Sequence, residues 1–351
     1  MTISQNMSTD NETDDCNVPN KSTYDALSWL MVGEFMLGLP LNLSVLYIFI
    51  FRFKFWKNKS ILLFNIVVAD FLLVVCLPAR AYNYQNGLRR SEDNVVCKIM
   101  LFMLFLNRGA SITFLITLTI DRYFNVVHLG RRNFVKGLKK SPQFSIIIWV
   151  LLLPLTIPTM LQKNGCCNSL GRNEDTQDVV DILREVVFFS EILIPFVILV
   201  FCTVRIVHRL RKKTVGEKAK LRRAMWLVMS VVVVFSVCFL PCAVARAVLL
   251  IVRRKGAGDG HSALLPSERQ EAEDAVVQVY DGLMVLSYTD CLLDPLVYCL
   301  SNSGFKNAYM STFCPTFLQK RLKKYDISST TATNTATTSA ARKISLPFVG
   351  K

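Results

Sequence analysis

The segment Cys97–Val127 reads CKIMLFMLFLNRGASITFLITLTIDRYFNVV, and its length and composition decide the fold class. A helix of about 20 mostly apolar residues crosses the roughly 30 Å hydrocarbon core of a bilayer. Two polar features interrupt this segment: Arg108 near its middle and the Asp121-Arg122-Tyr123 motif near its end. A helix rises about 1.5 Å per residue, so Arg108 lies about 16 Å along the helix from Cys97. Because an ionisable side chain at that depth is costly, Arg108 is a candidate functional residue.

Six more segments of the 351-residue chain are apolar and long enough to cross a membrane. They are Trp29–Phe51, Ile61–Tyr82, Phe144–Met160, Ile182–Val207, Ala224–Val252 and Ala275–Leu300. The segment Phe144–Met160 is the weakest because it contains Pro154 and Pro158. With 52% hydrophobic and 19% charged residues, the chain is more apolar than a soluble domain. We therefore expect an all-α membrane protein: a seven-transmembrane helix bundle followed by a short amphipathic eighth helix.

The formal net charge of +15 is concentrated in the loops that follow the odd-numbered segments. Cytoplasmic loops carry an excess of Lys and Arg, so these loops are predicted to face the cytoplasm and anionic membrane lipid. The predicted parts are an extracellular tail (1–28), a membrane domain (29–313) and a disordered cytoplasmic tail (314–351). Asn6, Asn11 and Asn20 each begin a triplet typical of N-glycosylation acceptors, which an extracellular tail permits.

Other functional classes fit the sequence less well. Nucleic acid is not expected as a partner, because the basic residues are divided among loops instead of lying on one soluble domain. The two halves of the chain show no repeat of the kind found in many transporters. No catalytic triad, metal-ligand motif or phosphate-binding loop occurs within the predicted spans, and the chain has only three His. We therefore expect no enzyme activity and no cofactor apart from a sodium ion.

Several short motifs occur in a fixed order along the predicted spans. They are Leu63-Phe64-Asn65, Ala69-Asp70, Asp121-Arg122-Tyr123, Trp149, Pro195, Cys238-Phe239-Leu240-Pro241 and Asp294-Pro295-Leu296-Val297-Tyr298. In this order and spacing they resemble those of a rhodopsin-like (class A) G-protein-coupled receptor. The stretch Asn107-Arg108-Gly109-Ala110-Ser111-Ile112, with Gly33-Glu34-Phe35, is similar to the hydroxycarboxylic acid receptors and the oxoeicosanoid receptor.

The resemblance implies a receptor in the plasma membrane that binds a carboxylate small molecule. In that group, the arginine that matches Arg108 anchors the ligand carboxylate, and signalling runs mainly through inhibitory heterotrimeric G proteins. Asp121, Arg122 and Tyr123 are the implied G-protein coupling residues. The Ser- and Thr-rich segment Ser328–Ser339 is available to receptor kinases and arrestin.

The predicted ligand-binding residues are Arg108, Leu104, Arg246, Tyr288 and Ser169. Leu104 lies one turn from Arg108 on the same helix face and would form an apolar wall. Arg246 either contacts the ligand or extends its charge to water. Tyr288 is either a hydroxyl donor to the carboxylate or a core residue. A competing hypothesis is a peptide or chemokine-type receptor, in which Arg108 only pairs with Glu34 or Glu191.

Asp70, Ser111, Asp290 and Asp294 are expected to converge below the ligand. Asp290 and Asp294 are four residues apart and share a helix face. By resemblance to the class, this cluster binds sodium; the alternative is that one acid is protonated and hydrogen-bonded. The resemblance also implies a disulfide from Cys97 to Cys166 or Cys167, and Cys16 would take the other.

Overall fold

The structure is a computed structural model that describes residues 17–52, 61–89, 94–127, 142–157, 179–211, 215–258, 266–301 and 303–313. The chain divides into two compact units, Met1–Ser301 and Asn302–Lys351. The regular structure in the described residues is helical, apart from an isolated antiparallel bridge between Asn17 and Leu88. The predicted all-α membrane fold is therefore confirmed.

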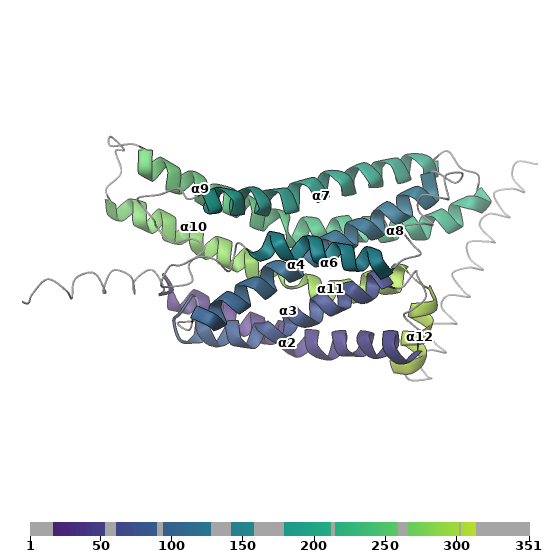
Figure 1. Cartoon of the computed structure of the whole chain (residues 1–351), viewed down its shortest axis with the longest axis horizontal. Coiled ribbons are helices and arrows are strands. Elements are labelled where there is room, and N and C mark those ends of the chain that lie inside the picture. The colour runs from purple at the N-terminus through teal and green to yellow at the C-terminus, as the bar shows by residue number, and fades with distance from the viewer. Residues whose placement is uncertain are drawn as a thin grey trace, which may run out of the picture. The chain divides into compact units, whose positions relative to one another are not determined.

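The helices of the first unit lie side by side and run along one common direction (Figure 1). They are α2 (Lys21–Tyr47) with the π-helical turn η1 (Ile48–Arg52), α3 (Ile61–Gln85), α4 (Asn94–Val127), α6 (Pro142–Thr156), α7 (Val179–Arg211), α8 (Val215–Cys238), α9 (Leu240–Gly258), α10 (Pro266–Ser287) and α11 (Asp290–Ser301). Helix α2 packs on α3, α3 on α4, α4 on α7, α7 on α8, and α9 on α10.

Five helical segments in the described ranges are long and apolar enough to cross a membrane. They are Lys21–Arg52, Ile61–Gln85, Val95–Phe124, Ile182–Arg209 and Met225–Arg254. The predicted fourth span corresponds to the shorter apolar helix Ser145–Pro154, because its outer part lies beyond the described residues. The predicted seventh span corresponds to α10 and α11, whose buried acids, such as Asp281, reduce the hydropathy.

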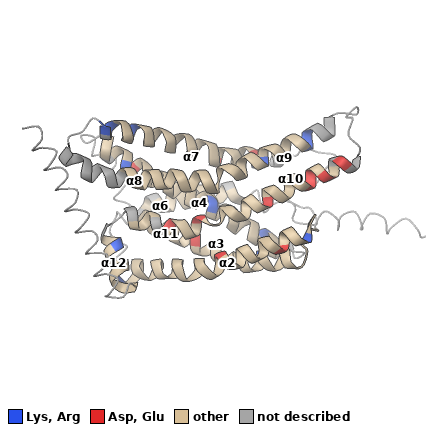
Figure 2. Cartoon of the chain, turned by 180° about the vertical axis from the view of Figure 1, so that it is seen from behind, with Lys and Arg blue, Asp and Glu red and all other residues tan. Residues whose placement is uncertain are grey.

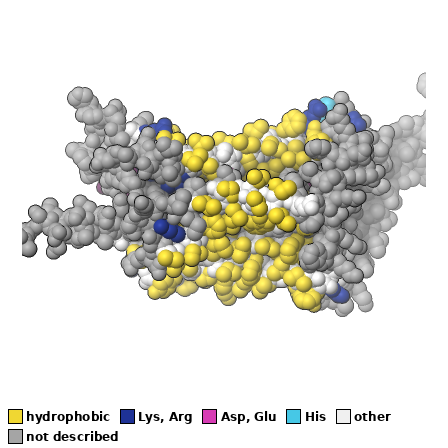
Figure 3. All heavy atoms as spheres, viewed as in Figure 1, with side chains coloured by type: hydrophobic (Ala, Val, Ile, Leu, Met, Phe, Trp, Pro, Cys, Tyr) yellow, Lys and Arg dark blue, Asp and Glu magenta, His cyan; other side chains and the backbone are white. Residues whose placement is uncertain are grey.

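Apolar side chains cover the outside of the bundle, as a lipid-facing surface requires. Trp29, Met36 and Val197 are each at least 64% exposed. Figure 3 shows hydrophobic side chains across the middle of the visible face, with Lys and Arg toward its two ends. In Figure 2 most charged residues likewise lie near the helix ends. Because water-exposed surfaces of this composition would be unfavourable, the distribution supports a membrane-spanning bundle.

Two of the predicted spans, the sixth and the seventh, each consist of two helices separated by a break. The sixth span changes from α8 to α9 at Phe239, two residues before Pro241, which has no N–H to donate. The seventh changes from α10 to α11 at Tyr288 and Thr289. There the Tyr288 N–H donates to the Val285 carbonyl at 2.9 Å and the Thr289 N–H to Leu286 at 3.2 Å. These bonds join residues three apart and tighten the chain, and the junction residue Tyr288 is buried.

Polar contacts fix the register between helices. Asn65 of α3 donates to Ser145 Oγ at 3.1 Å and accepts from Trp149 Nε1 at 2.8 Å, which joins α3 to α6. Asn42 of α2 donates to the Cys291 carbonyl at 3.1 Å, which joins α2 to α11. The Asn65 and Trp149 motifs are thus in direct contact, although they lie 84 residues apart in the sequence.

Helix α3 ends at a left-handed glycine. Gly87 has φ of 75°, and its N–H donates to the Tyr84 carbonyl at 3.0 Å. Glycine adopts this conformation without steric cost. The Gly87 carbonyl in turn accepts from the Val18 N–H at 3.0 Å, so the residues before α2 are fixed against the end of α3.

The second unit contains α12 (Ser303–Phe313), the predicted eighth helix. Phe305, Tyr309 and Phe313 follow one another at four-residue spacing. Their ring centroids lie 6.1 Å and 5.1 Å apart in turn. The three rings therefore form one aromatic face on a short helix, as the amphipathic prediction requires.

Candidate ligand-binding site

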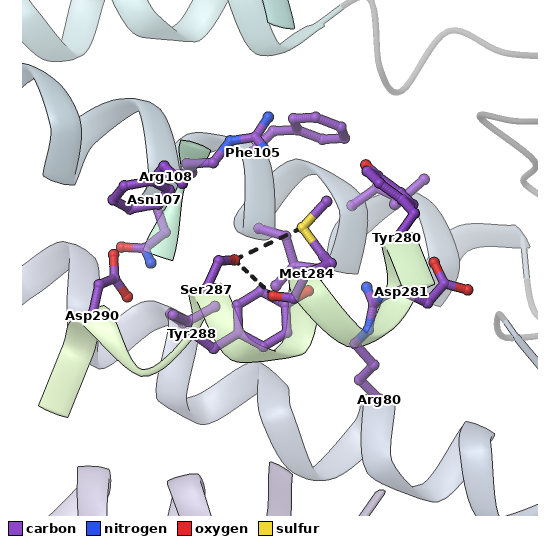
Figure 4. Close-up of a pocket in the computed structure, with 14 residues that line it drawn as sticks. Arg80, Phe105, Asn107, Arg108, Tyr280, Asp281, Met284, Ser287, Tyr288 and Asp290 are labelled. Carbon is purple, nitrogen blue, oxygen red and sulfur yellow. Dashed lines mark hydrogen bonds between the residues drawn. The ribbon is translucent and has the colours of Figure 1, made fainter. Parts of the chain in front are cut away.

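A cavity opens between α3, α4, α10 and the two helix breaks. Its empty space is about 610 Å³, including the part open to solvent. It is lined by Leu73, Arg80, Leu101, Leu104, Phe105, Asn107, Arg108, Phe239, Tyr280, Asp281, Met284, Ser287, Tyr288 and Asp290. Figure 4 shows these side chains converging from several helices. A largely apolar cavity with a few convergent polar groups is typical of a small-molecule site.

Arg108 of α4 is the central cation of this cavity. Its side chain is buried, with 7% of its surface exposed. The guanidinium carbon lies 4.4 Å from the Phe188 ring centroid and 5.1 Å from that of Phe105. Nε and Nη2 are buried without a hydrogen-bond partner among the described residues. The two rings hold the guanidinium between them by cation–π contact but do not neutralise its charge.

The two acids that could have paired with Arg108 do not do so. In the part of the chain that the structure describes, no carboxylate oxygen lies within 4.0 Å of the Arg108 nitrogens. Glu34 of α2 is 2% exposed, and both of its carboxyl oxygens lack a hydrogen-bond partner there. Arg108 thus forms no ion pair within 4.0 Å with Glu34 or Glu191, although Glu191 is near enough to attract its charge over a longer distance.

Tyr288 occupies the break between α10 and α11 and lines the same cavity. Its hydroxyl is buried without a hydrogen-bond partner in the described ranges. The neighbouring Ser287 hydroxyl is already used, because it donates to the Met284 carbonyl at 2.6 Å. The cavity therefore presents one unused hydroxyl donor in addition to the Arg108 guanidinium.

Arg246 of α9, in contrast, has an anion of its own. Its Nε donates to Glu185 Oε2 at 3.0 Å, and its Nη2 donates to the other carboxylate oxygen. It is 4% exposed, so its charge does not extend to water. Arg246 does not line the cavity, although it lies 5.7 Å from the Phe188 ring that also contacts Arg108. Its predicted ligand contact stays a prediction, and here Arg246 joins α9 to α7.

The four residues of the predicted acid cluster are all buried. Asp70 accepts from the Tyr298 hydroxyl at 3.0 Å, and Asp294 accepts from the Ser111 hydroxyl at 3.4 Å. One oxygen of each of Asp70, Asp290 and Asp294 has no hydrogen-bond partner among the described residues. No group of three or more His, Cys, Asp or Glu in those residues is arranged to hold a metal ion. The cluster offers carboxylate and hydroxyl oxygens, the ligand type that hard cations prefer.

The Asp121-Arg122-Tyr123 motif lies near the end of α4. Tyr123 belongs to an apolar cluster with Val126 of α4, Cys202 and Ile206 of α7, and Val228 of α8. Its ring centroid lies 5.9 Å from that of Phe201. The motif is thus placed where α4, α7 and α8 meet.

A family model described as 7 transmembrane receptor (rhodopsin family) matches residues 41–298. The chain belongs to the rhodopsin family of seven-transmembrane receptors. It is 33% identical over 297 residues to Hydroxycarboxylic acid receptor 2 of Homo sapiens, covering 82% of this chain and 77% of that receptor. It is 30% identical over 305 residues to the 12-(S)-hydroxy-5,8,10,14-eicosatetraenoic acid receptor of Mus musculus, covering 85% and 92%.

The chain is also 27% identical over 292 residues to Oxoeicosanoid receptor 1 of Homo sapiens, covering 83% of this chain and 73% of that receptor. These relatives are receptors and not enzymes. The predicted resemblance to this receptor group is therefore confirmed, and so are the multi-pass membrane architecture and the assignment as a non-enzyme.

Several predicted receptor residues lie outside the described ranges. They are Ser169, Cys166, Cys167, Cys16, Asn6 and Asn11. Cys97 is disulfide-bonded, and the choice of its partner stays a prediction. Asn20 is exposed and caps α2, where its side-chain oxygen accepts from the Ser22 N–H at 3.1 Å. A glycan attaches through the amide nitrogen, so this cap is compatible with the predicted modification.

The structure adds two cavity residues that sequence reasoning missed, Arg80 and Asp281. Both are ionisable and lie inside predicted spans, Ile61–Tyr82 and Ala275–Leu300. The criterion that selected Arg108 would have selected them as well. Asp281 accepts from the Tyr24 hydroxyl at 2.7 Å and from Arg89 Nη2 at 3.0 Å. It therefore joins α10 to the start of α2 and to the residues that follow α3.

Proposed function

We propose that this receptor is activated by a small or fatty carboxylic acid, of the hydroxycarboxylic or oxo-fatty type, and signals mainly through inhibitory G proteins to lower cyclic AMP. The observation that carries the proposal is Arg108, a buried cation that lines the cavity and has no anion among the described residues. A charge in such a place is stabilised when an anion meets it.

The chemistry of the cavity favours a carboxylate as that anion. A guanidinium presents parallel N–H groups that match a carboxylate bidentately, and such charge-assisted pairs are the stronger hydrogen bonds. Phe105 and Phe188 contact the Arg108 guanidinium by cation–π interaction. The unused Tyr288 hydroxyl is a second donor, and Leu104 supplies an apolar wall. The printed names of the relatives refer to hydroxycarboxylic and hydroxyeicosatetraenoic acids, which are carboxylic acids.

We further propose the remaining receptor properties by analogy with the family. Asp121, Arg122 and Tyr123 contact the G protein, and the tail beyond residue 314 recruits receptor kinases and arrestin. Asp70, Ser111, Asp290 and Asp294 bind a sodium ion. The protein resides in the plasma membrane with its N-terminus outside.

The experiment is an agonist screen in cells that express the receptor. Hydroxy acids and oxo-fatty acids are added, and the fall in forskolin-raised cyclic AMP is measured. We expect a carboxylic acid to lower cyclic AMP, pertussis toxin to block the effect, and the methyl ester of that acid to fail. A calcium response that survives the toxin, with no cyclic AMP change, would contradict inhibitory coupling. A response to basic peptides with none to acids would favour the peptide-receptor alternative.

A further inference from the structure

A second arginine, Arg80 of α3, lines the same cavity as Arg108. Its Nη2 donates to the Tyr84 hydroxyl at 3.0 Å. Its guanidinium carbon lies 5.4 Å from the Tyr84 ring centroid and 5.8 Å from the Tyr288 ring centroid. Its Nε is buried without a hydrogen-bond partner in the described part of the chain. The two tyrosines orient the group, but neither neutralises it.

The nearest acid on the cavity wall is already used by another arginine. Asp281 accepts from Arg89 through both carboxylate oxygens, Oδ1 from Nη2 at 3.0 Å and Oδ2 from Nε at 2.5 Å. Oδ2 also accepts from the Tyr24 hydroxyl. One carboxylate is thus matched by one guanidinium, and no ion pair within 4.0 Å forms between Asp281 and Arg80. Arg80 therefore shares the longer-range attraction of Asp281 with Arg89 but has no carboxylate of its own within 4.0 Å among the described residues.

The other acid on the wall, Asp290, does not neutralise Arg80 either. In Figure 4 Asp290 and Arg80 lie at opposite ends of the labelled residues. Among the described residues, Asp290 forms no ion pair within 4.0 Å with Arg80 or Arg108. The cavity lining thus contains two guanidinium groups, and in the described part of the chain neither has a carboxylate within 4.0 Å.

The two arginines lie at different depths. Helices α3 and α4 run in opposite directions, so the end of α3 and the start of α4 lie at the same end of the bundle. Of the lining residues of α3, Arg80 is the nearest to that end. Of the lining residues of α4, Arg108 is the farthest from it. Each helix contributes lining residues seven positions apart, Leu73 to Arg80 and Leu101 to Arg108. At about 1.5 Å per residue, the lining of each helix therefore extends about 10 Å along its axis.

The space between the two cations suits a short carbon chain. Figure 4 shows Met284, Ser287 and Tyr288 between the Arg108 and Arg80 side chains. Leu73, Leu104 and Met284 provide apolar wall. A ligand with an anion at each end and methylene groups between them would meet both guanidinium groups and the apolar wall at once.

We propose that the ligand carries two anionic groups, as a dicarboxylate or hydroxy-dicarboxylate does, with one carboxylate on Arg108 and the other on Arg80. This inference rests on the proposed carboxylate-receptor function and narrows its ligand class. Arg80 is the residue that selects for the second charge. Tyr84 positions it, and the Tyr84 ring packs edge-on against Tyr24 at 4.9 Å, which in turn donates to Asp281.

The test compares acids of equal chain length that differ only in the second charge. Adipate is compared with hexanoate and with monomethyl adipate, and suberate with octanoate. Potency in the cyclic AMP assay and thermal stabilisation of the purified receptor in detergent are both measured. We expect each dicarboxylate to be roughly 10- to 100-fold more potent than the monocarboxylate of equal length. This factor corresponds to the free energy of a hydrogen bond to a charged group. Monomethyl adipate should behave like hexanoate.

Variants assign the preference to Arg80. Arg80→Gln should reduce the ratio of dicarboxylate to monocarboxylate potency to near one, and Arg80→Lys should keep part of it. Arg253→Ala, which removes an arginine paired with Glu273 away from the cavity, should leave the ratio unchanged. If Arg80→Gln weakens both acids equally, Arg80 is a structural residue and the proposal is overturned.

The outcomes separate the two proposals. If the parent receptor responds equally to dicarboxylates and monocarboxylates, or is stabilised by no dicarboxylate, the two-anion inference fails while the carboxylate proposal stands on its own screen. If Arg108→Ala responds to both acids as the parent does, the carboxylate proposal itself fails.

Discussion

Two sets of arginines in this bundle differ in whether a carboxylate pairs with them. Arg89, Arg246 and Arg253 each form an ion pair, with Asp281, Glu185 and Glu273, and each pair joins separate segments of the fold. Arg80 and Arg108 line the cavity, and neither has a carboxylate within 4.0 Å among the described residues. A buried pair holds helices together, whereas a buried cation without a partner is a place for an external anion. Under the proposed function, this difference distinguishes the arginines that join helices from those that bind the ligand.

The largest expected effect comes from breaking a paired arginine. Asp281→Asn removes the carboxylate that accepts from Arg89 and Tyr24 and leaves Arg89 without its anion. Removing one partner of a buried pair costs about 3–5 kcal/mol. We expect a large fall in the thermal midpoint of the purified receptor.

The matched control is Arg108→Ala, which removes no protein ion pair and should lower the midpoint far less. If Arg108→Ala destabilises the receptor as much as Asp281→Asn, then Arg108 has a structural partner and the distinction between the two sets of arginines is wrong.

A smaller effect is expected at the acid cluster. If sodium binds among Asp70, Ser111, Asp290 and Asp294, raising sodium should weaken agonist affinity, because the two ligands favour different receptor states. Allosteric couplings of this kind amount to about 1–3 kcal/mol, or roughly 5- to 150-fold in affinity. Asp70→Asn should remove the dependence. A sodium effect that persists in this variant would count against the site. If sodium has no effect on the parent receptor, the alternative of a protonated, hydrogen-bonded acid is favoured.

The smallest effect is expected at Tyr288. Tyr288→Phe removes the unused hydroxyl but keeps the ring that faces Arg80. A neutral hydrogen bond contributes about 0.5–1.5 kcal/mol, so agonist affinity should fall by roughly 2- to 12-fold with little change in stability. The measurement is competition binding alongside the thermal midpoint. Unchanged affinity would show that Tyr288 is a core residue and not a hydroxyl donor to the ligand.

Hydropathy was sufficient to predict the helical bundle, because a membrane span needs only length and apolar composition. The depth of Arg108 in the membrane could also be predicted, because it follows from the helix rise per residue and the number of residues after Cys97. The seventh span was harder to delimit: its acids reduce the hydropathy, and the break at Tyr288 depends on local hydrogen bonds.

The pairing of the charged residues could not be predicted. Asp281 contacts Tyr24 and Arg89, which are 257 and 192 residues away, and Arg246 contacts Glu185, 61 residues away. Helical periodicity indicates which residues share a face of one helix but not which neighbouring helix that face meets. Arg80 and Arg246 therefore look alike in the sequence. Only the fold shows that Arg246 pairs with Glu185, whereas Arg80 has no carboxylate within 4.0 Å among the described residues.

If Arg108 anchors the ligand carboxylate, the affinity of the receptor for the acid depends on the Arg108 guanidinium. Truncating one partner of a buried charge pair costs about 2–5 kcal/mol, or roughly 30- to several-thousand-fold in affinity. At equal surface expression, the affinity of Arg108→Ala for the acid should be lower than that of the parent by this factor. Arg108→Lys should keep a weaker response, because it retains the charge but not the planar fork. If Arg108→Ala reaches the surface and binds the acid with unchanged affinity, the account is contradicted.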